Sequence, residues 1–301
     1  MNKKKLMKGI PIIILSLYVG LIGCKGEEKV YDEANIEILN SIKTELALTD
    51  DVLNSVNEII KWQTDGADDD LEKIKSAQEN YEIYDGASLS AEDANVKYEE
   101  FGACIEKIKA SKEKIDALEK RDVEQVNMTI DAANVYYERL LGALDDLNKV
   151  FTFNREVNSV ISKMGSVDAS SYDSGSAATK AVFESIDSGI SELEAIDCPS
   201  FMQQVFDKEI LGYKRLLEII YEENLGYVYK DSMKHHAAIN MYSRVNYELQ
   251  QYRFDLLNDY NMQFKRVSER LETQIMPLRD EINKNADILL PTLGYETEGG
   301  N

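Results

Sequence analysis

The sequence predicts an all-α protein: an elongated antiparallel helical bundle, or two such bundles, built from long helices with heptad patterns. Apolar residues recur at steps of three and four along most of the 301 residues, which is the spacing of one helix face. Only four prolines and 16 glycines interrupt this pattern, and no stretch alternates apolar and polar residues as a half-buried strand would. A hydrophobic content of 44% is enough to bury a core.

The first expected helix is about 30 residues long, with Thr49-Asp50-Asp51 as an alternative start of a second helix. Between Trp62 and Asp70 the pattern stops at Gly66 and a group of aspartates. A shorter helix is therefore expected from Leu71 to about Tyr84, with the acids at the positive end of its dipole. A turn is expected over residues 86–90. The seam of the first helix consists of Leu39, Ile42, Leu46, Thr49, Leu53, Val56 and Ile60.

Two further helices are expected before residue 165. One ends near Lys120, and its apolar face carries Tyr98, Phe101, Ile105, Ile108 and Ile115. The next is expected to continue to about Met164. Eight consecutive steps of three and four make its seam the most regular in the chain, which indicates an antiparallel neighbour. The seam is Val123, Val126, Ile130, Ala133, Tyr137, Leu140, Leu144, Leu147 and Phe151.

Residues 165–176 are rich in Gly and Ser, which is typical of a flexible linker, so we expect a helical half at 31–164 and another at 177–291. In the second half, a helix carrying Val182, Ile186, Ile190 and Leu193 is expected to close at Asp197-Cys198-Pro199. Pro199 should start the following helix, which runs to about Met233. A final long helix should end or kink at Pro277, and residues 292–301 should be a frayed tail.

A short segment of the chain recurs. Tyr137-Glu138-Arg139-Leu140-Leu141 is followed 76 residues later by Tyr213-Lys214-Arg215-Leu216-Leu217. Either duplication of a helical hairpin or a shared heptad pattern would produce this similarity.

The first 24 residues have the pattern of a segment that directs a protein out of the cytoplasm. Lys3, Lys4, Lys5 and Lys8 precede an apolar stretch from Ile10 to Ile22, the pattern of a secretory signal. The 14 residues from Ile10 to Gly23 fall short of the roughly 20 that a transmembrane helix needs. Leu21-Ile22-Gly23-Cys24 resembles the lipobox of bacterial lipoproteins.

That resemblance implies cleavage of residues 1–23 as a signal peptide and lipidation of Cys24 by fatty acyl chains such as palmitate. Residues 24–30 would then be a tether, and the folded part would lie on the extracytoplasmic face of the cell membrane. An uncleaved signal anchor is the alternative. The turn from Ala195 to Pro199 is loosely similar to one found in uncharacterised helical lipoproteins, a likeness that implies no activity.

The chain is strongly acidic. Its formal net charge is −21, and loss of residues 1–23, with four lysines and no acid, changes that to −25. Such a chain is repelled by phosphates and by anionic lipids, which excludes nucleic acid as a partner. Attachment to the membrane would therefore depend on the acyl chains, and more than one chain is needed for firm anchoring.

Eight of the 17 tyrosines fall between Tyr213 and Tyr260. They cannot all face one core, because neighbours such as Tyr242 and Tyr247 diverge on a helix. Exposed tyrosines favour interfaces, although tyrosine also fills wide helix–helix seams with its hydroxyl in water. We expect contacts with a protein or an extracellular ligand at Tyr221, Tyr227, Tyr229, Tyr242, Tyr247 and Tyr252.

No pattern of catalytic or metal-binding residues is found. The aspartates from Asp65 to Asp70 lack the order of a calcium-binding EF-hand loop. His235 and His236 adjoin and so point about 100° apart on a helix, unlike a metal-binding pair at i and i+4. Cys104 and Cys198 fit two small buried side chains better than a disulfide. We therefore expect no cofactor, no metal and no catalytic residue.

The sequence thus favours a non-enzymatic lipoprotein that binds a protein or an extracellular ligand, or serves as a scaffold. The alternative function is a solute-binding or sensor component associated with a membrane transporter. Solute-binding proteins usually have two α/β lobes, a pattern that this sequence lacks.

Overall fold

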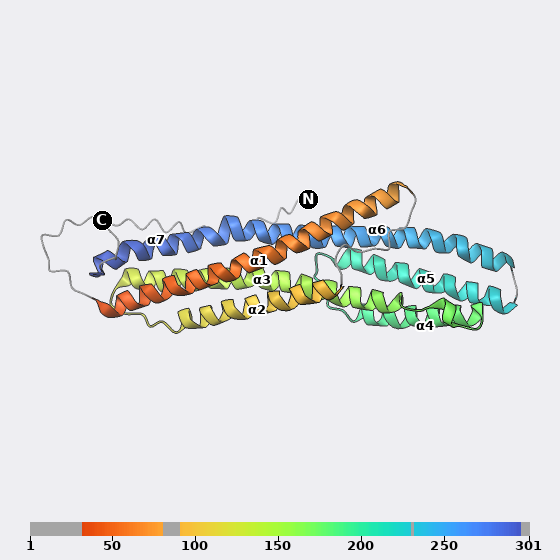
Figure 1. Ribbon diagram of the computed structural model, residues 1–301, viewed down its shortest axis with the longest axis horizontal. Coiled ribbons are helices and arrows are strands. Elements are labelled where there is room, and N and C mark those ends of the chain that lie inside the picture. Colours follow the sequence, from red (N-terminus) through yellow and green to blue (C-terminus); the bar gives the residue numbers. More distant parts are fainter. Residues whose placement is uncertain (1–31, 81–90, 230–231, 296–301) are drawn as a thin grey trace, which may run out of the picture.

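The computed structural model describes residues 32–80, 91–229 and 232–295 (Figure 1). The all-α prediction is confirmed, since the described residues contain helices and no strand. A 3₁₀ turn covers Ala169–Ser171, and a π-helical turn covers Leu271–Ile275. The α-helices are α1 (Glu33–Glu79), α2 (Ala91–Asp116), α3 (Glu124–Met164), α4 (Gly175–Glu194), α5 (Gln203–Tyr229), α6 (Ser232–Arg270) and α7 (Met276–Thr292).

The helices form an elongated bundle (Figure 1). α6, the π turn and α7 follow one another along the whole length, and these 61 residues span about 90 Å at 1.5 Å per residue. We call the end where α1 begins and α7 finishes the proximal end. There the Asp32 amide donates to the Leu293 carbonyl at 3.1 Å. The distal end is where α5 meets α6.

The long C-terminal helix continues past Pro277, where an end or a kink is expected from the sequence. A proline has no N–H to give to the preceding turn. The π-helical turn just before Pro277 changes the backbone hydrogen-bond pattern of the helix. In this turn the Met276 amide donates to the Leu271 carbonyl, five residues back. Leu271 and Ile275 both stay buried, so the core continues through the irregularity.

α1 is a single helix of 47 residues, so the predicted interruption at residues 62–70 is wrong, as is a new helix start at Asp50. Gly66 lies inside the helix because α1 packs along α6 here. Gln63, Ala67 and Ile74 are buried and extend the seam of α1. The turn expected at residues 86–90 lies outside the described residues.

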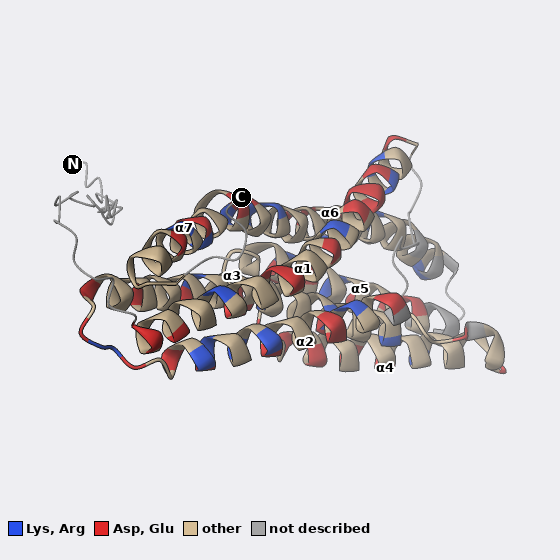
Figure 2. Cartoon of the chain, turned by 60° about the vertical axis from the view of Figure 1, so that its left-hand side comes forward, with Lys and Arg blue, Asp and Glu red and all other residues tan. Residues whose placement is uncertain are grey.

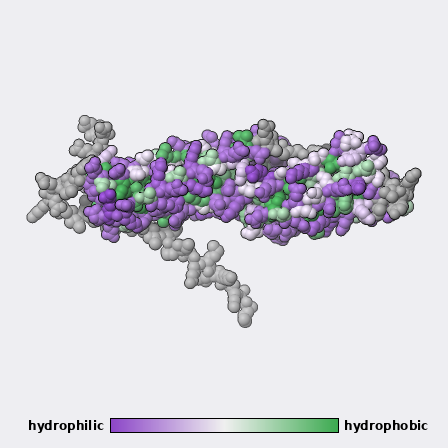
Figure 3. Space-filling model, turned by 90° about the horizontal axis from the view of Figure 1, so that it is seen from below, coloured by the Kyte–Doolittle hydropathy of each residue, from purple (hydrophilic) through white to green (hydrophobic). Residues whose placement is uncertain are grey.

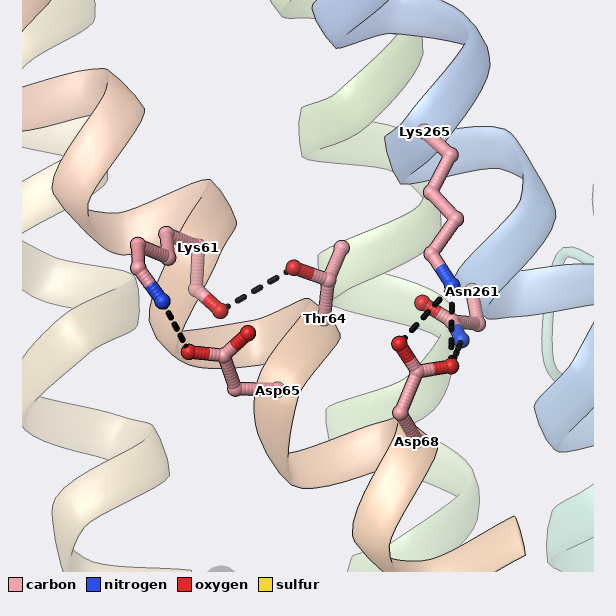
Figure 4. Close-up of polar contacts among 6 residues, drawn as sticks. All are labelled: Lys61, Thr64, Asp65, Asp68, Asn261 and Lys265. Atoms are coloured by element: carbon pink, nitrogen blue, oxygen red, sulfur yellow. Dashed lines mark hydrogen bonds and ion pairs between the residues drawn. The ribbon is translucent and has the colours of Figure 1, made fainter.

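The aspartate group therefore lies within a helix, not at its start. Asp68 reaches across to α6, where it accepts hydrogen bonds from Asn261 at 2.7 Å and Lys265 at 2.8 Å (Figure 4). Asp65 instead pairs with Lys61 on α1 itself (Figure 4). Asp68 thus joins two helices whose residues are almost 200 positions apart in the sequence.

Packing does not divide the molecule at residues 165–176. α7, which belongs to the expected second half, packs against α1 and α3 of the first. The buried apolar residues form one continuous cluster that includes members of every α-helix. The Gly/Ser-rich stretch itself is ordered locally: the Asp168 carboxylate accepts from the Ser170 amide, and the Ser174 hydroxyl caps α4.

The expected fraying does not begin at residue 292. Gly294 adopts φ 90°, a left-handed conformation that suits glycine, and its amide bonds to the Pro291 carbonyl. The Tyr295 amide bonds to the Leu290 carbonyl at 3.1 Å, which completes a Schellman motif. Residues 296–301 lie outside the described part.

The regular seam of α3 is confirmed. Its members from Val126 to Phe151 are all buried. Tyr137 in this seam is fully buried, and its hydroxyl lies 2.9 Å from the Thr49 hydroxyl on α1 and bonds to Ser111 on α2. Burial raises the pKa of Tyr137 to about 12. One phenol therefore connects three helices.

Tyr137→Phe is expected to lower the free energy of unfolding by about 1–3 kcal/mol, because Thr49 would keep a buried hydroxyl without its partner. Urea denaturation measures the change. Tyr136→Phe is the matched control: Tyr136 is equally buried, but its hydroxyl bonds to no described residue. Equal losses for the two variants would contradict the role given to the Tyr137 hydroxyl.

The two Tyr-x-Arg-Leu-Leu segments occupy similar environments on α3 and α5. Tyr137 and Tyr213 are both buried, as are Leu140 and Leu216. A shared heptad pattern would give the same burial, so duplication stays a prediction.

Candidate functional site

The candidate site is the distal surface formed by α5 and α6, so it depends on how these helices hold each other. They are antiparallel and close: a Cβ added to Gly212 of α5 would lie 2.6 Å from a methyl carbon of Leu249 on α6. An ion pair between Arg215 and Glu248 at 3.0 Å joins the same helices at the surface. The hairpin is thus fixed by contacts along both helices.

A buried acid lies deeper in this interface. Glu209 of α5 is completely buried, and Arg253 of α6 approaches its carboxylate at 3.4 Å. The same guanidinium donates to the Tyr213 hydroxyl. Burial raises the pKa of Glu209 above its usual value, an effect that the charge of Arg253 partly offsets. Sequence reasoning missed this acid, although its spacing places it between Phe206 and Tyr213 in the apolar seam of α5.

The tyrosines expected to make contacts do not form one cluster. Tyr221 on α5 is 52% exposed, with its ring 6.3 Å from that of Phe183 on α4. Tyr242 and Tyr247 on α6 are 42% and 43% exposed. Five residues at 100° each place them about 140° apart around the helix. The tyrosines therefore belong to different faces of the distal end.

The other tyrosines proposed as contacts are less informative. Tyr252 is half-buried and packs near Gly212, at the α5–α6 interface. The side chains of Tyr227 and Tyr229 lie outside the described residues.

Sequence reasoning missed the methionines of α6. Met233 is 81% exposed and Met241 57% exposed, more than Tyr242 or Tyr247 on the same helix. Together with Arg244 and Tyr247 they lie within about 120° of the helix circumference. Spacing at seven residues, as from Met233 to Asn240 to Tyr247, was the signal available for this second face.

Charge is distributed unevenly around the molecule. Acidic residues mark much of α1 and α2, whereas the distal part of α6 carries few charged residues (Figure 2). On the face seen from below, apolar residues are scattered among hydrophilic ones (Figure 3). The distal part of α6 therefore differs from α1 and α2 in its charge.

The structure brings no reactive cluster together in its described part. Cys104 and Cys198 are both free. Burial raises the pKa of the Cys104 thiol above its usual value, and it raises the pKa of Cys198 to about 12, so neither is a ready thiolate. Among the described residues, His, Cys, Asp and Glu side chains form no group of three that could hold a metal ion. None of the described helices is long and apolar enough to cross a membrane.

A shallow surface hollow lies at the proximal end, far from the tyrosines. The first turns of α1 and the connection from α2 to α3 line it, with Glu37, Ile38, Leu118 and Arg121 among its residues. The hollow is therefore not part of the distal surface.

Comparison with protein-family models, with curated proteins and with solved structures finds no match for this chain. The fold by itself defines an all-α protein of the elongated helical-bundle class. Its function must be argued from its own residues.

Proposed function

We propose that this chain is a lipid-anchored, extracytoplasmic, non-enzymatic module that binds a protein or an extracellular ligand through its distal α5–α6 surface. The basic, apolar and Leu-Ile-Gly-Cys segments of residues 3–24 support the anchor. The observation that carries the proposal is the placement of the two ends: the folded chain starts at the proximal end, and the exposed Tyr221, Tyr242 and Tyr247 lie on the distal helices.

The distances fit a module that extends from a membrane. The eight residues from Cys24 to Tyr31 reach at most about 28 Å, even when fully extended. The bundle itself is about 90 Å long, so an anchor at Cys24 keeps Asp32 near the bilayer and lets an upright bundle hold its distal end far from it. Charge repulsion would add to this, because the acidic body avoids an anionic bilayer.

The all-α fold favours this function over that of a solute-binding component, whose usual form is a pair of α/β lobes. The described part of the chain contains no strand from which such a lobe would be built.

Mass spectrometry of the chain recovered from bacterial membranes tests the anchor. The expected product begins at Cys24 and carries added acyl mass, whereas Cys24→Ser should keep residues 1–23 and gain no acyl mass. Cys198→Ser is the matched control and should be processed normally. An intact, unmodified amino terminus on the unsubstituted chain would refute the proposal.

A further inference from the structure

We propose that the outer face of distal α6 binds the same face of a second copy of this chain, in an antiparallel, two-fold symmetric pair. By the outer face we mean the exposed side chains that lie within the 120° of the α6 circumference described above. They are Met233, Ala237, Asn240, Met241, Arg244 and Tyr247.

The outer face continues an existing helix–helix interface. α1 packs along α6 through the Asp68–Lys265 ion pair and a hydrogen bond between Gln78 and Gln251 at 3.2 Å. α1 then ends at Glu79. Beyond that point the same side of α6 is exposed.

Helical spacing places the exposed residues on the side that α1 covers. Lys265 and Gln251 are 14 residues apart, and Tyr247 follows one turn further. Asn240 and Met233 come next, each seven residues on, so all five lie on one side of α6. A second helix could therefore lie along this side of α6, beyond the last residue of α1.

The distribution of charged residues along the chain favours a second copy as the partner of the outer face. The chain carries 55 acids and a net charge of −21, so two copies repel along most of their length. Residues 232–249 hold a single acid, Glu248, together with Lys234 and Arg244. Salt screens charges beyond about 10 Å, so contact at this end leaves the acidic bodies out of range.

The antiparallel register also suits the side chains. With the two-fold axis at Asn240, the two amides face each other, and Met233 lies against Tyr247 of the second copy, a favourable sulfur–aromatic contact. A parallel pair would instead place Arg244 against the same arginine and bring the acidic bodies side by side.

The contact area indicates weak association. The 15 residues from Met233 to Tyr247 span about 22 Å of one helix. A single helix face of that length buries less than the roughly 800 Å² per partner of a standard interface. If the chain is anchored as proposed above, antiparallel pairing directs the two proximal ends apart, so the paired copies would stand on opposing membrane surfaces.

Sedimentation of the full chain, purified in detergent with micelles in excess, tests the pairing. We expect a concentration-dependent dimer. Because each substitution occurs twice in the pair, Met233→Glu or Tyr247→Glu should lower the association constant at least ten-fold. Leu211→Glu is the matched control, since this side chain is 50% exposed on α5, outside the outer face, and the substitution should leave association unchanged. All these side chains are exposed, and circular dichroism checks that the variants remain folded.

Disulfide cross-linking tests the register. A mixture of Met233→Cys and Tyr247→Cys chains should form a cross-linked dimer, whereas Met233→Cys alone should not. A monomer at every concentration would overturn the proposal, and so would cross-linking of Met233→Cys with itself. Vesicle flotation of the same preparation reports the anchor separately: a dimer that does not bind vesicles refutes only the anchor, and a vesicle-bound monomer refutes only the pairing.

Discussion

Phe264→Ala is expected to lower the free energy of unfolding by about 3–5 kcal/mol, the usual cost of removing a buried phenylalanine. Phe264 of α6 has no exposed surface, and its ring lies 4.7 Å from that of Phe151 on α3. The Phe151 ring in turn lies 5.1 Å from that of Phe101 on α2. These aromatic pairs add about 0.5–1.5 kcal/mol each beyond their buried area. The substitution therefore opens the point where three helices meet.

The effect should extend to the whole molecule, because one core runs through both halves. Urea unfolding of Phe264→Ala should show one transition at a lower midpoint with an unchanged slope. Fluorescence of Trp62, the single tryptophan, reports α1, and far-UV circular dichroism reports all helices. The two signals should coincide.

Met262→Ala is the matched control, since this side chain lies on the same helix and is 42% exposed. Its effect should stay within about 0.5 kcal/mol. Two separate transitions, with only one of them moved by Phe264→Ala, would show that residues 31–164 and 177–291 unfold as independent halves.

The sequence predicted the parts of the fold that depend on local periodicity. The seam of α3 repeats every three and four residues without a break, and the helix follows it from residue 124 to 164. The expected break in α1 shows the limit of this reasoning. Gly66 and the aspartates beside it weaken the local pattern, but packing of Ala67 and Ile74 stabilises the helix through it. That stabilisation comes from α6, which no local pattern includes.

The candidate site could be predicted only in part. Composition drew attention to the tyrosines between Tyr213 and Tyr260, and Tyr221, Tyr242 and Tyr247 are indeed exposed. Which face each one occupies depends on where α5 and α1 pack, which is tertiary information. The pairing of Glu209 with Arg253 was not predicted for the same reason, since the two residues lie 44 positions apart.

Arg253→Met is expected to lower the free energy of unfolding by about 3 kcal/mol at pH 7. It leaves the fully buried carboxylate of Glu209 without its cation, and loss of one partner of a buried pair costs about 3–5 kcal/mol. We expect the lower end of this range because Arg253 is itself 43% exposed. Arg266→Met, which changes an exposed arginine of the same helix, is the control and should change stability by less than about 0.5 kcal/mol.

The pH dependence gives a sharper test of the same group. Burial raises the pKa of Glu209 in the folded state, so the folded protein holds this proton to higher pH than the unfolded chain does. The stability from the neutral carboxyl is therefore complete below the unfolded pKa of about 4.3, and it is lost as the pH rises through the folded pKa.

Arg253 is the group that lowers the pKa of Glu209. Replacing Arg253 with methionine should therefore raise the folded-state pKa of Glu209 further, so that the neutral carboxyl persists to higher pH. The loss caused by Arg253→Met should consequently shrink as the pH falls towards 4. Glu209→Gln cannot ionise and should lack the slope altogether, in the presence or absence of Arg253. If the Arg253→Met loss were equal at every pH from 4 to 8, the guanidinium would be stabilising the α5–α6 interface through its packing on Tyr213, whose ring centre lies 5.8 Å away, and not through charge.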